Sequence, residues 1–392
     1  MKISFVLPET GITGGTRAVF ECANRLKAKG HIVNIVYPLI PQKILPKSRI
    51  RAVASQIKYF ITQLIKGNKV DWFEVNAPLI RIPYFSRIFE WLTPDADIVI
   101  ATAWQTAFFV NKLSKSKGKK MYFVQHYEVW DMWDSEECWE KAGNIEKDKN
   151  KVALAMAEVV PSDPHILKLK RLVDSTYVMP LLKITTSSFL EDLLFRQFKQ
   201  KSFGKVPIGV NLQEFYPQKE NGHKNVILMP FRGIGWKGGM DGLKAVEIVR
   251  SMFSDVKIIM FGPERFRKYM PDWVKYLGTI YGSRLRKAYS NANIFISPTW
   301  VEGWGCPQME AMACGSAVVT TNVGAVNDYA INGETAVIVP PRDHIRLAEA
   351  CIDLLRDDEK RNRIARAGQE YIKQFTWERT VDQLEKILEQ AI

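Results

Sequence analysis

The sequence predicts an α/β protein with two doubly wound domains, each built on a parallel sheet. A strand, a glycine-rich turn, a helix and a second strand follow one another in residues 2–38, and the same order returns in residues 225–262. Strand–helix–strand units of this length are typical of parallel sheets. The 392 residues, of which 46% are hydrophobic, are enough for two such domains.

The N-terminal half contains the first of these units and several further elements. KISFVL is the first strand, PETGITGGT is the turn, and RAVFECANRLKAKG, residues 17–30, is the first helix. HIVNIVYP, ADIVIATAW and KMYFVQH have the short apolar character of buried strands. ITTSSFLEDLLFRQF predicts a strand and then a helix that begins at a serine cap. Residues 128–175 are acidic and rich in tryptophan, and we expect them to be irregular or helical.

The C-terminal half repeats the pattern. NVILMPF and VKIIMFG are strands that flank the turn RGIGWKGG and the helix MDGLKAVEIVRSMF. The strands NIFISPTW, SAVVTTNVG and TAVIVPP then alternate with the helices LRKAYSNA, CPQMEAMA and IRLAEACIDLLRD. TWERTVDQLEKILEQ is a last amphipathic helix that Thr376 caps.

The connector VPIGVNLQEFYP, marked by glycine and proline, indicates a hinge near residues 200–220. We therefore divide the chain into a Rossmann-like domain at residues 1–205 and a second at residues 206–375. Residues 376–392 form a terminal helix that we expect to return toward the first domain.

Composition excludes several classes of protein. The longest apolar runs are far shorter than the ~20 residues that a membrane-spanning helix needs. The five cysteines are widely spaced without a CxxC pair, which argues against a disulfide framework or a zinc ribbon and fits a reducing compartment. The first residues lack the apolar stretch of a signal peptide. We therefore expect a cytoplasmic protein.

Positive charge is concentrated in the first third of the chain. The formal net charge is +13, and residues 1–127 hold 19 basic and 7 acidic residues. Residues 39–70 mix lysine and arginine with apolar side chains, as an amphipathic helix on an anionic membrane does. A solvated basic face on an ordinary helix is the alternative. Nucleic acid is not expected, because no nucleic-acid-binding motif accompanies the charge.

Two glutamates and a glycine-rich loop carry the chemical signal of the second domain. In VEGWGCPQMEAMACG, Glu302 precedes a helix and Glu310 lies inside it. Pro307 suits the start of that helix, so the N–H groups of residues 303–306 are available to an anion or a sugar hydroxyl. Carboxylates accept paired hydrogen bonds from vicinal diols. Ribose and sugar hydroxyls are therefore natural ligands for this segment.

The segment E-G-W-G-C-P-Q-M-E resembles the signature of the family 4 retaining glycosyltransferases, which have the two-domain GT-B fold. The N-terminal glycine-rich loop and helix, the interdomain segment and the pair formed by Arg232 and Lys237 resemble the same family. The resemblance implies that residues 1–205 bind the acceptor and that residues 206–375 bind a nucleotide sugar.

The family's residue roles transfer to matching positions of this chain. Catalytic roles fall on Glu302, Arg232, Lys237 and His126, with the two cations on the donor diphosphate and His126 near the transferred sugar. Glu310 is implied to bind the ribose diol. Further donor contacts are implied for Gly14, Gly15, Gly303, Trp304, Gly305 and Cys306, and Gly262, Ile280 and Tyr281 are implied to flank the base.

The resemblance implies transfer of a hexosyl group, with retention, from a nucleotide-diphosphate sugar to a glycan or lipid-linked acceptor. It implies a place in surface polysaccharide or glycolipid biosynthesis, at the inner face of the cell membrane. No cofactor and no metal are expected, because Arg232, Lys237 and a helix N-terminus can balance the diphosphate charge. The alternatives are a GT-B sugar-nucleotide epimerase and a non-catalytic sugar-nucleotide-binding subunit. The oligomeric state stays open.

Overall fold

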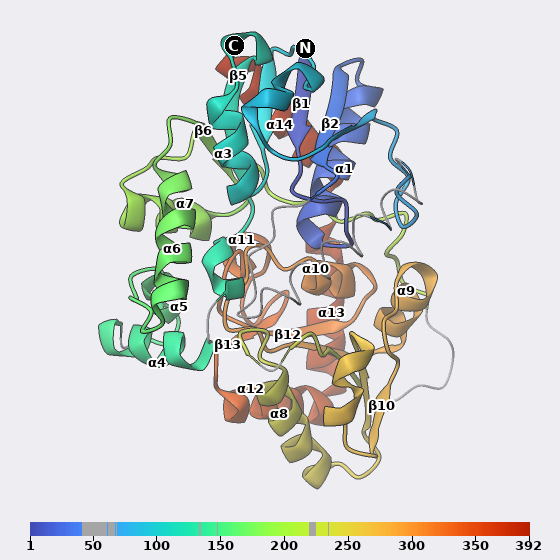
Figure 1. Ribbon diagram of the computed structural model, residues 1–392. Coiled ribbons are helices and arrows are strands. Elements are labelled where there is room, and N and C mark those ends of the chain that lie inside the picture. The colour runs from blue at the N-terminus through green and yellow to red at the C-terminus, as the bar shows by residue number, and fades with distance from the viewer. Residues whose placement is uncertain are drawn as a thin grey trace.

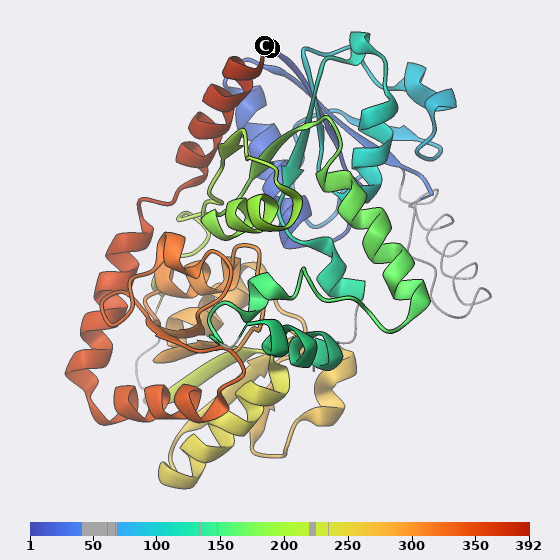
Figure 2. The ribbon, with the colours of Figure 1, turned by 90° about the vertical axis from the view of Figure 1, so that its left-hand side faces the viewer.

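The chain forms two parallel sheets, one in each half, with helices on their faces (Figures 1 and 2). The computed structural model describes residues 1–40, 61, 67, 69–132, 135–146, 148–218, 225–233 and 235–392. The predicted fold class, GT-B with two Rossmann-like domains, is confirmed. Most of the basic segment at residues 39–70, on which the predicted membrane contact depends, lies outside the described residues.

Within the described residues, the N-terminal sheet has seven parallel strands in the order β3-β2-β1-β4-β5-β6-β7. The strands are β1 (Lys2–Val6), β2 (Ile32–Pro38), β3 (Leu79–Ile82), β4 (Ile98–Ala101), β5 (Lys119–Val124), β6 (Leu182–Thr185) and β7 (Gly204–Lys205). The order reverses between β1 and β4, the kind of position where doubly wound sheets bind ligands.

Helices connect these strands. They are α1 (Gly14–Ala28), α3 (Trp104–Lys112), α4 (Ser135–Ile145), α5 (Val152–Ala155), α6 (Pro164–Tyr177) and α7 (Ser188–Phe198), with the 3-10 helices η1 (Arg87–Leu92), η2 (Lys115–Lys117) and η3 (Glu128–Met132). Residues 128–175, expected to be irregular or helical, are largely helical where the structure describes them.

The C-terminal sheet has six parallel strands in the order β10-β9-β8-β11-β12-β13, again counted over the described part of the chain. They are β8 (Val226–Pro230), β9 (Lys257–Phe261), β10 (Val274–Tyr276), β11 (Ile294–Ser297), β12 (Ala317–Thr321) and β13 (Val337–Val339). The helices are α8 (Gly239–Met252), η4 (Glu264–Tyr269), α9 (Gly282–Asn291), α10 (Cys306–Ala313), α11 (Val326–Tyr329), α12 (His344–Arg356) and α13 (Asp358–Ile372).

The central strands are buried on both faces, as the sequence pattern predicts. All residues of β4, β8, β11 and β12 are buried, and most are valine, isoleucine or alanine. Near-continuous apolar strands are typical of parallel sheets that helices cover on both sides. None of the helices in the described part of the chain combines the length and apolar content that crossing a bilayer requires.

The start of α1 corrects one sequence prediction. Gly14 and Gly15, predicted in a turn before a helix at residues 17–30, lie in the first turn of the helix itself. The Thr13 side chain accepts a hydrogen bond from the Thr16 amide at 3.0 Å and caps the helix earlier than predicted. The amides of the two glycines therefore belong to the N-terminus of α1, and neither residue has a side chain that would cover the backbone there.

The last helix, α14 (Trp377–Ala391), packs against α1 of the first domain (Figure 2). Lys29 on α1's C-terminal side pairs with Asp382 at 2.8 Å, and His31 contacts Glu385 at 2.6 Å. The chain crosses between the domains twice, once in the connector that contains Val210 and once before α14. The two crossings lie side by side, and the Val210 amide donates a hydrogen bond to the Phe375 carbonyl at 2.9 Å.

We expect Leu384→Ala to lower the free energy of unfolding by about 2–5 kcal/mol, because Leu384 on α14 is fully buried and its loss leaves a cavity. Urea unfolding followed by circular dichroism measures the change. Lys386→Ala, at an exposed position of the same helix, is the matched control. Equal effects of the two substitutions would contradict the structural role given to α14.

Candidate active site

A cavity of about 590 Å³ lies between the two domains. Its walls come from loops at the carboxyl ends of strands in both sheets. The N-terminal domain contributes residues 13–16, Thr102, Ala103, Gln105, Gln125, His126, Glu128 and Thr186, and the C-terminal domain contributes Arg232, Trp236, Lys237 and residues 302–307. Loops at these strand ends meet at one edge of a parallel sheet, which is where such folds bind ligands.

Lys237 and Glu302 form the central ion pair of this cavity. Their Nζ and Oε2 atoms are 3.1 Å apart, and each side chain is about 20% exposed. Burial opposes ionisation of Glu302, but Lys237 above all, then His126 and Arg232, lower the pKa of the carboxyl below its usual value. Glu302 is therefore an anion at neutral pH and accepts hydrogen bonds.

Loop packing explains how two segments far apart in sequence meet here. The loop after β8 contacts the loop after β11, because the Trp300 amide donates to the Trp236 carbonyl at 2.8 Å. Lys237 Nζ lies 3.8 Å from the centre of the Trp236 indole, which adds a cation–π attraction. The His126 ring of the N-terminal domain also packs against Trp236, with the two ring centres 5.4 Å apart.

Glycines bring the domains into backbone contact. A Cβ at Gly303 would lie 2.3 Å from the Gln125 carbonyl oxygen of the opposite domain. Gly305 has φ +108°, and a Cβ there would meet the Tyr329 hydroxyl at 2.5 Å. Both positions therefore need glycine. Gly303 allows the two backbones to approach closely, and Gly305 allows both a close approach and a positive φ.

The structure brings most of the sequence-predicted residues to this cavity. Its lining includes Gly14, Gly15, His126, Arg232, Lys237, Glu302, Gly303, Trp304, Gly305 and Cys306. Burial, with the nearby Glu310 and Glu302 charges, raises the pKa of the Cys306 thiol to about 12, so this side chain is a neutral part of the wall.

Glu310 lies within α10 and is not among the residues that line the cavity. Its side chain is 13% exposed and accepts a hydrogen bond from the Tyr289 hydroxyl at 3.0 Å. Burial raises the pKa of Glu310, although Arg17, the Tyr289 hydrogen bond and Arg232 oppose this shift.

The three residues expected beside the base also lie outside the cavity lining. Gly262 and Ile280 are buried, whereas Tyr281 is 74% exposed at the start of α9. Ile280 packs in the same apolar cluster as Tyr289, whose hydroxyl bonds Glu310.

Sequence reasoning missed several residues of the site. Thr102, Gln125 and Thr186 line the cavity at the ends of β4, β5 and β6, and their positions directly after buried strands were the signal that could have found them. Glu128 also lines it, where its carboxylate accepts hydrogen bonds from the Trp104 amide at 2.8 Å and the Tyr122 hydroxyl at 2.7 Å. Glu128 thereby fixes the start of α3.

The described residues contain no group of three or more histidine, cysteine, aspartate or glutamate side chains placed to share a metal ion. Two of the charged residues that line the cavity, Lys237 and Glu302, are paired across two loops of the C-terminal domain, and Arg232 is exposed on the same wall.

Comparison with known proteins agrees with this geometry. Residues 212–371 match the family model described as "Glycosyl transferases group 1". The O-antigen chain mannosyltransferase B of Escherichia coli is 32% identical over 111 residues, which cover 28% of this chain and 29% of that protein. The phosphatidyl-myo-inositol mannosyltransferase of Mycobacterium leprae is 26% identical over 215 residues, or 50% of this chain and 57% of that one. The chain thus spans less than two thirds of the curated relatives that it matches.

Solved structures resemble the whole chain. Sucrose-phosphate synthase from Thermosynechococcus elongatus has a TM-score of 0.71 at 18% identity, with 99% of this chain and 98% of that chain covered. Anabaena Alr3699/HepE, in complex with UDP-glucose, has a TM-score of 0.68 at 13% identity and full coverage of both chains. The chain therefore has the GT-B fold, and its residues 212–371 resemble the glycosyl transferases group 1 family.

Proposed function

We propose that the chain is a retaining glycosyltransferase that moves a hexosyl group from a nucleotide-diphosphate sugar to a glycan or lipid-linked acceptor. The observation that carries the proposal is the cleft in which Arg232, Lys237 and the start of α10 face Gly14 and Gly15 of the opposite domain. The UDP-glucose complex of a structural neighbour supports such a donor. The names of the two mannosyltransferase relatives support a role in polysaccharide or glycolipid biosynthesis.

The leaving diphosphate is stabilised by fixed positive charge. Arg232 and Lys237 supply two cations, and the amides at the start of α10 add a helix N-terminus. Groups that are already in place when negative charge develops contribute most to such a reaction. We infer that these groups replace a metal ion in balancing the diphosphate.

Glu302 and His126 hold the transferred sugar. Glu302 is ionised and fixed by Lys237, so its remaining lone pairs accept hydrogen bonds from sugar hydroxyls. His126 lies between the Trp130 and Trp236 rings, at 4.8 and 5.4 Å, which fix the direction of its imidazole. The sugar is thereby oriented with C1 toward the acceptor side of the cleft.

Retention follows from a reaction on one face of the sugar. The bond from C1 to the donor phosphate oxygen breaks, and the bond from C1 to the acceptor oxygen forms on the same face. The acceptor proton passes to the departing phosphate oxygen. Glu302 is committed to Lys237, and the Cys306 thiol has a pKa of about 12, so neither is disposed to act as the nucleophile.

A second groove, of about 400 Å³, supports an amphiphilic acceptor. Phe85, Trp104 and Phe108 line it together with Arg87 and Lys112, and Gln105 lines both this groove and the main cavity. On η1 beside it, Ile88 and Trp91 are 72% and 74% exposed. Exposed tryptophan and isoleucine next to cations suit an anionic membrane surface. We propose that the acceptor reaches the cleft from this side.

The proposal predicts that Lys237→Met lowers kcat by about 10²–10³-fold, because the leaving diphosphate loses a fixed cation. Release of nucleoside diphosphate from UDP-, GDP-, dTDP- and ADP-sugars measures turnover, and EDTA in the assay tests metal independence. Lys244→Met, on the exposed face of α8, is the control. Activity that EDTA abolishes and Mg²⁺ restores would contradict the metal-free mechanism.

The reaction product separates the proposed transferase from the two alternatives. Proton NMR of a transferase product shows a new glycosidic bond with the anomeric configuration of the donor. A rearranged free sugar nucleotide would instead indicate an epimerase, and binding without turnover would indicate a non-catalytic subunit.

Gly303→Ala is expected to lower kcat while nucleotide affinity stays within about threefold of wild type. The new Cβ would lie 2.3 Å from the Gln125 carbonyl oxygen and would force the domains apart. Steady-state kinetics and calorimetric titration with the nucleotide measure the two effects. Gly143→Ala, where a Cβ meets nothing within 4 Å, is the control and should behave as wild type.

Membrane contact through η1 predicts salt-sensitive binding to vesicles of phosphatidylcholine and phosphatidylglycerol. The double substitution Ile88→Ser/Trp91→Ser should reduce cosedimentation, because it removes the exposed apolar side chains of this surface. Ile145→Ser, at another exposed isoleucine, should leave binding unchanged. Binding that is insensitive to salt, or equal for all three proteins, would argue against this surface.

A further inference from the structure

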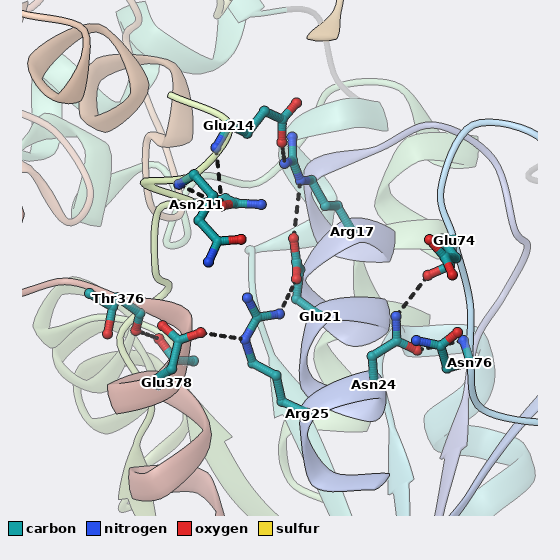
Figure 3. Close-up of polar contacts among 12 residues, drawn as sticks. Arg17, Glu21, Asn24, Arg25, Glu74, Asn76, Asn211, Glu214, Thr376 and Glu378 are labelled. Atoms are coloured by element: carbon teal, nitrogen blue, oxygen red, sulfur yellow. Dashed lines mark hydrogen bonds and ion pairs between the residues drawn. The ribbon is translucent and has the colours of Figure 1, made fainter. Parts of the chain in front are cut away.

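Arg17, in the first turn of α1, contacts three carboxylates from different parts of the chain, of which Figure 3 shows Glu21 and Glu214. Its guanidinium bonds Glu214 in the connector between the domains. It also lies 3.8 Å from Glu21 on its own helix and 3.9 Å from Glu310 in the C-terminal domain. The side chain is 27% exposed and packs over the Phe215 ring at 5.7 Å. Arg17 thus links α1 to the opposite domain.

Arg17 is the first member of a row of alternating charges on α1. Arg17, Glu21 and Arg25 are spaced four residues apart and share one face of the helix. Arg25 bonds Glu21 and also pairs with Glu378 at 3.1 Å, at the start of α14. Figure 3 shows the row turned toward both crossings between the domains. Arg25 therefore contacts the start of α14, whereas Arg17 contacts both the connector residue Glu214 and the candidate site residue Glu310.

Glu310 needs a nearby cation because it is mostly buried. Burial favours its neutral form, and the largest opposing influence is the attraction of Arg17, followed by the hydrogen bond from Tyr289 and the charge of Arg232. Glu214 adds repulsion, and the nearby thiols of Cys306 and Cys314 have pKa values of about 12 and are neutral. An ionised carboxylate accepts hydrogen bonds from both hydroxyls of a vicinal diol, whereas a protonated one is a poorer acceptor.

We propose that Arg17 is a positioning residue for donor binding, in which an arginine of the N-terminal domain holds the Glu310 carboxylate of the C-terminal domain charged and aligned for the ribose diol. This inference rests on the proposed function, in which Glu310 binds ribose. The connector residue Glu214 anchors the guanidinium from the other side. Nucleotide affinity thereby depends on a residue of the domain opposite the nucleotide.

Calorimetric titration with UDP, GDP, dTDP and ADP tests the inference. We expect Arg17→Met to lower the affinity for the nucleotide that wild type binds by about tenfold. Arg17→Lys should retain part of that affinity. Arg25→Met is the matched control, because it breaks the same row of charges without touching Glu310. Its nucleotide affinity should stay within about twofold of wild type.

A double-mutant cycle separates positioning from a general loss of structure. Once Glu310→Gln has removed the charge, adding Arg17→Met should weaken binding no further. In Arg17→Met alone, the carboxyl is protonated at a higher pH, so affinity should fall at a higher pH than in wild type as the solution is acidified. If Arg17→Met does not fold, Arg17→Lys replaces it, and its smaller loss must also vanish in the Glu310→Gln background.

Each outcome has a distinct meaning. Equal losses for Arg17→Met and Arg25→Met, or losses that add to that of Glu310→Gln, would overturn the positioning role and leave the proposed function intact. Wild-type protein that binds none of the four nucleotides would overturn the proposed function and the inference together.

Discussion

The burial of two carboxylates on one loop–helix segment is the electrostatic constraint on which the site depends. Glu302 and Glu310 are 20% and 13% exposed, and a charge in such a position costs several kcal/mol unless a partner offsets it. The C-terminal domain supplies Lys237 for Glu302, whereas the N-terminal domain supplies Arg17 for Glu310. The constraint therefore involves both domains, which it links through Arg17 on α1 and Glu310 on α10.

The two sheets meet this constraint by the same device. In each sheet the strand order reverses next to the first strand of the domain, and the loops at that point carry the functional side chains. Close approach of the two edges requires backbone without side chains at the contact, which Gly303 provides against Gln125. The cavity is thus formed where two sheet edges face each other, and neither domain contains it alone.

Much of the fold and part of the site were predictable from local sequence patterns. Apolar strands, capped helices and glycine turns follow from interactions within a few residues. The spacing of Glu302 and Glu310 marks the segment to which the family resemblance assigns sugar and ribose binding. Arg17 could not be found in this way. On a helix, the spacing of Arg17, Glu21 and Arg25 is equally typical of a solvated face, and the partners Glu214 and Glu378 lie far along the chain. The early start of α1 was missed because glycines at these positions favour a turn. The Thr13 side chain, however, caps the helix and stabilises its first turn.

The arrangement of charges also ties donor binding to the position of the domains. The largest cationic influence on Glu302 comes from Lys237 in its own domain, and His126 of the opposite domain adds a smaller one, so the ionisation of Glu302 depends less on closure. The largest cationic influence on Glu310 comes from the opposite domain, so a movement that separates α1 from α10 weakens it. A ligand that needs Glu310 ionised therefore binds better to the closed arrangement, and by linkage it favours that arrangement when bound. In the proposed function, Glu302 holds the transferred sugar and Glu310 holds the ribose, so the ribose contact is the one that depends most on closure.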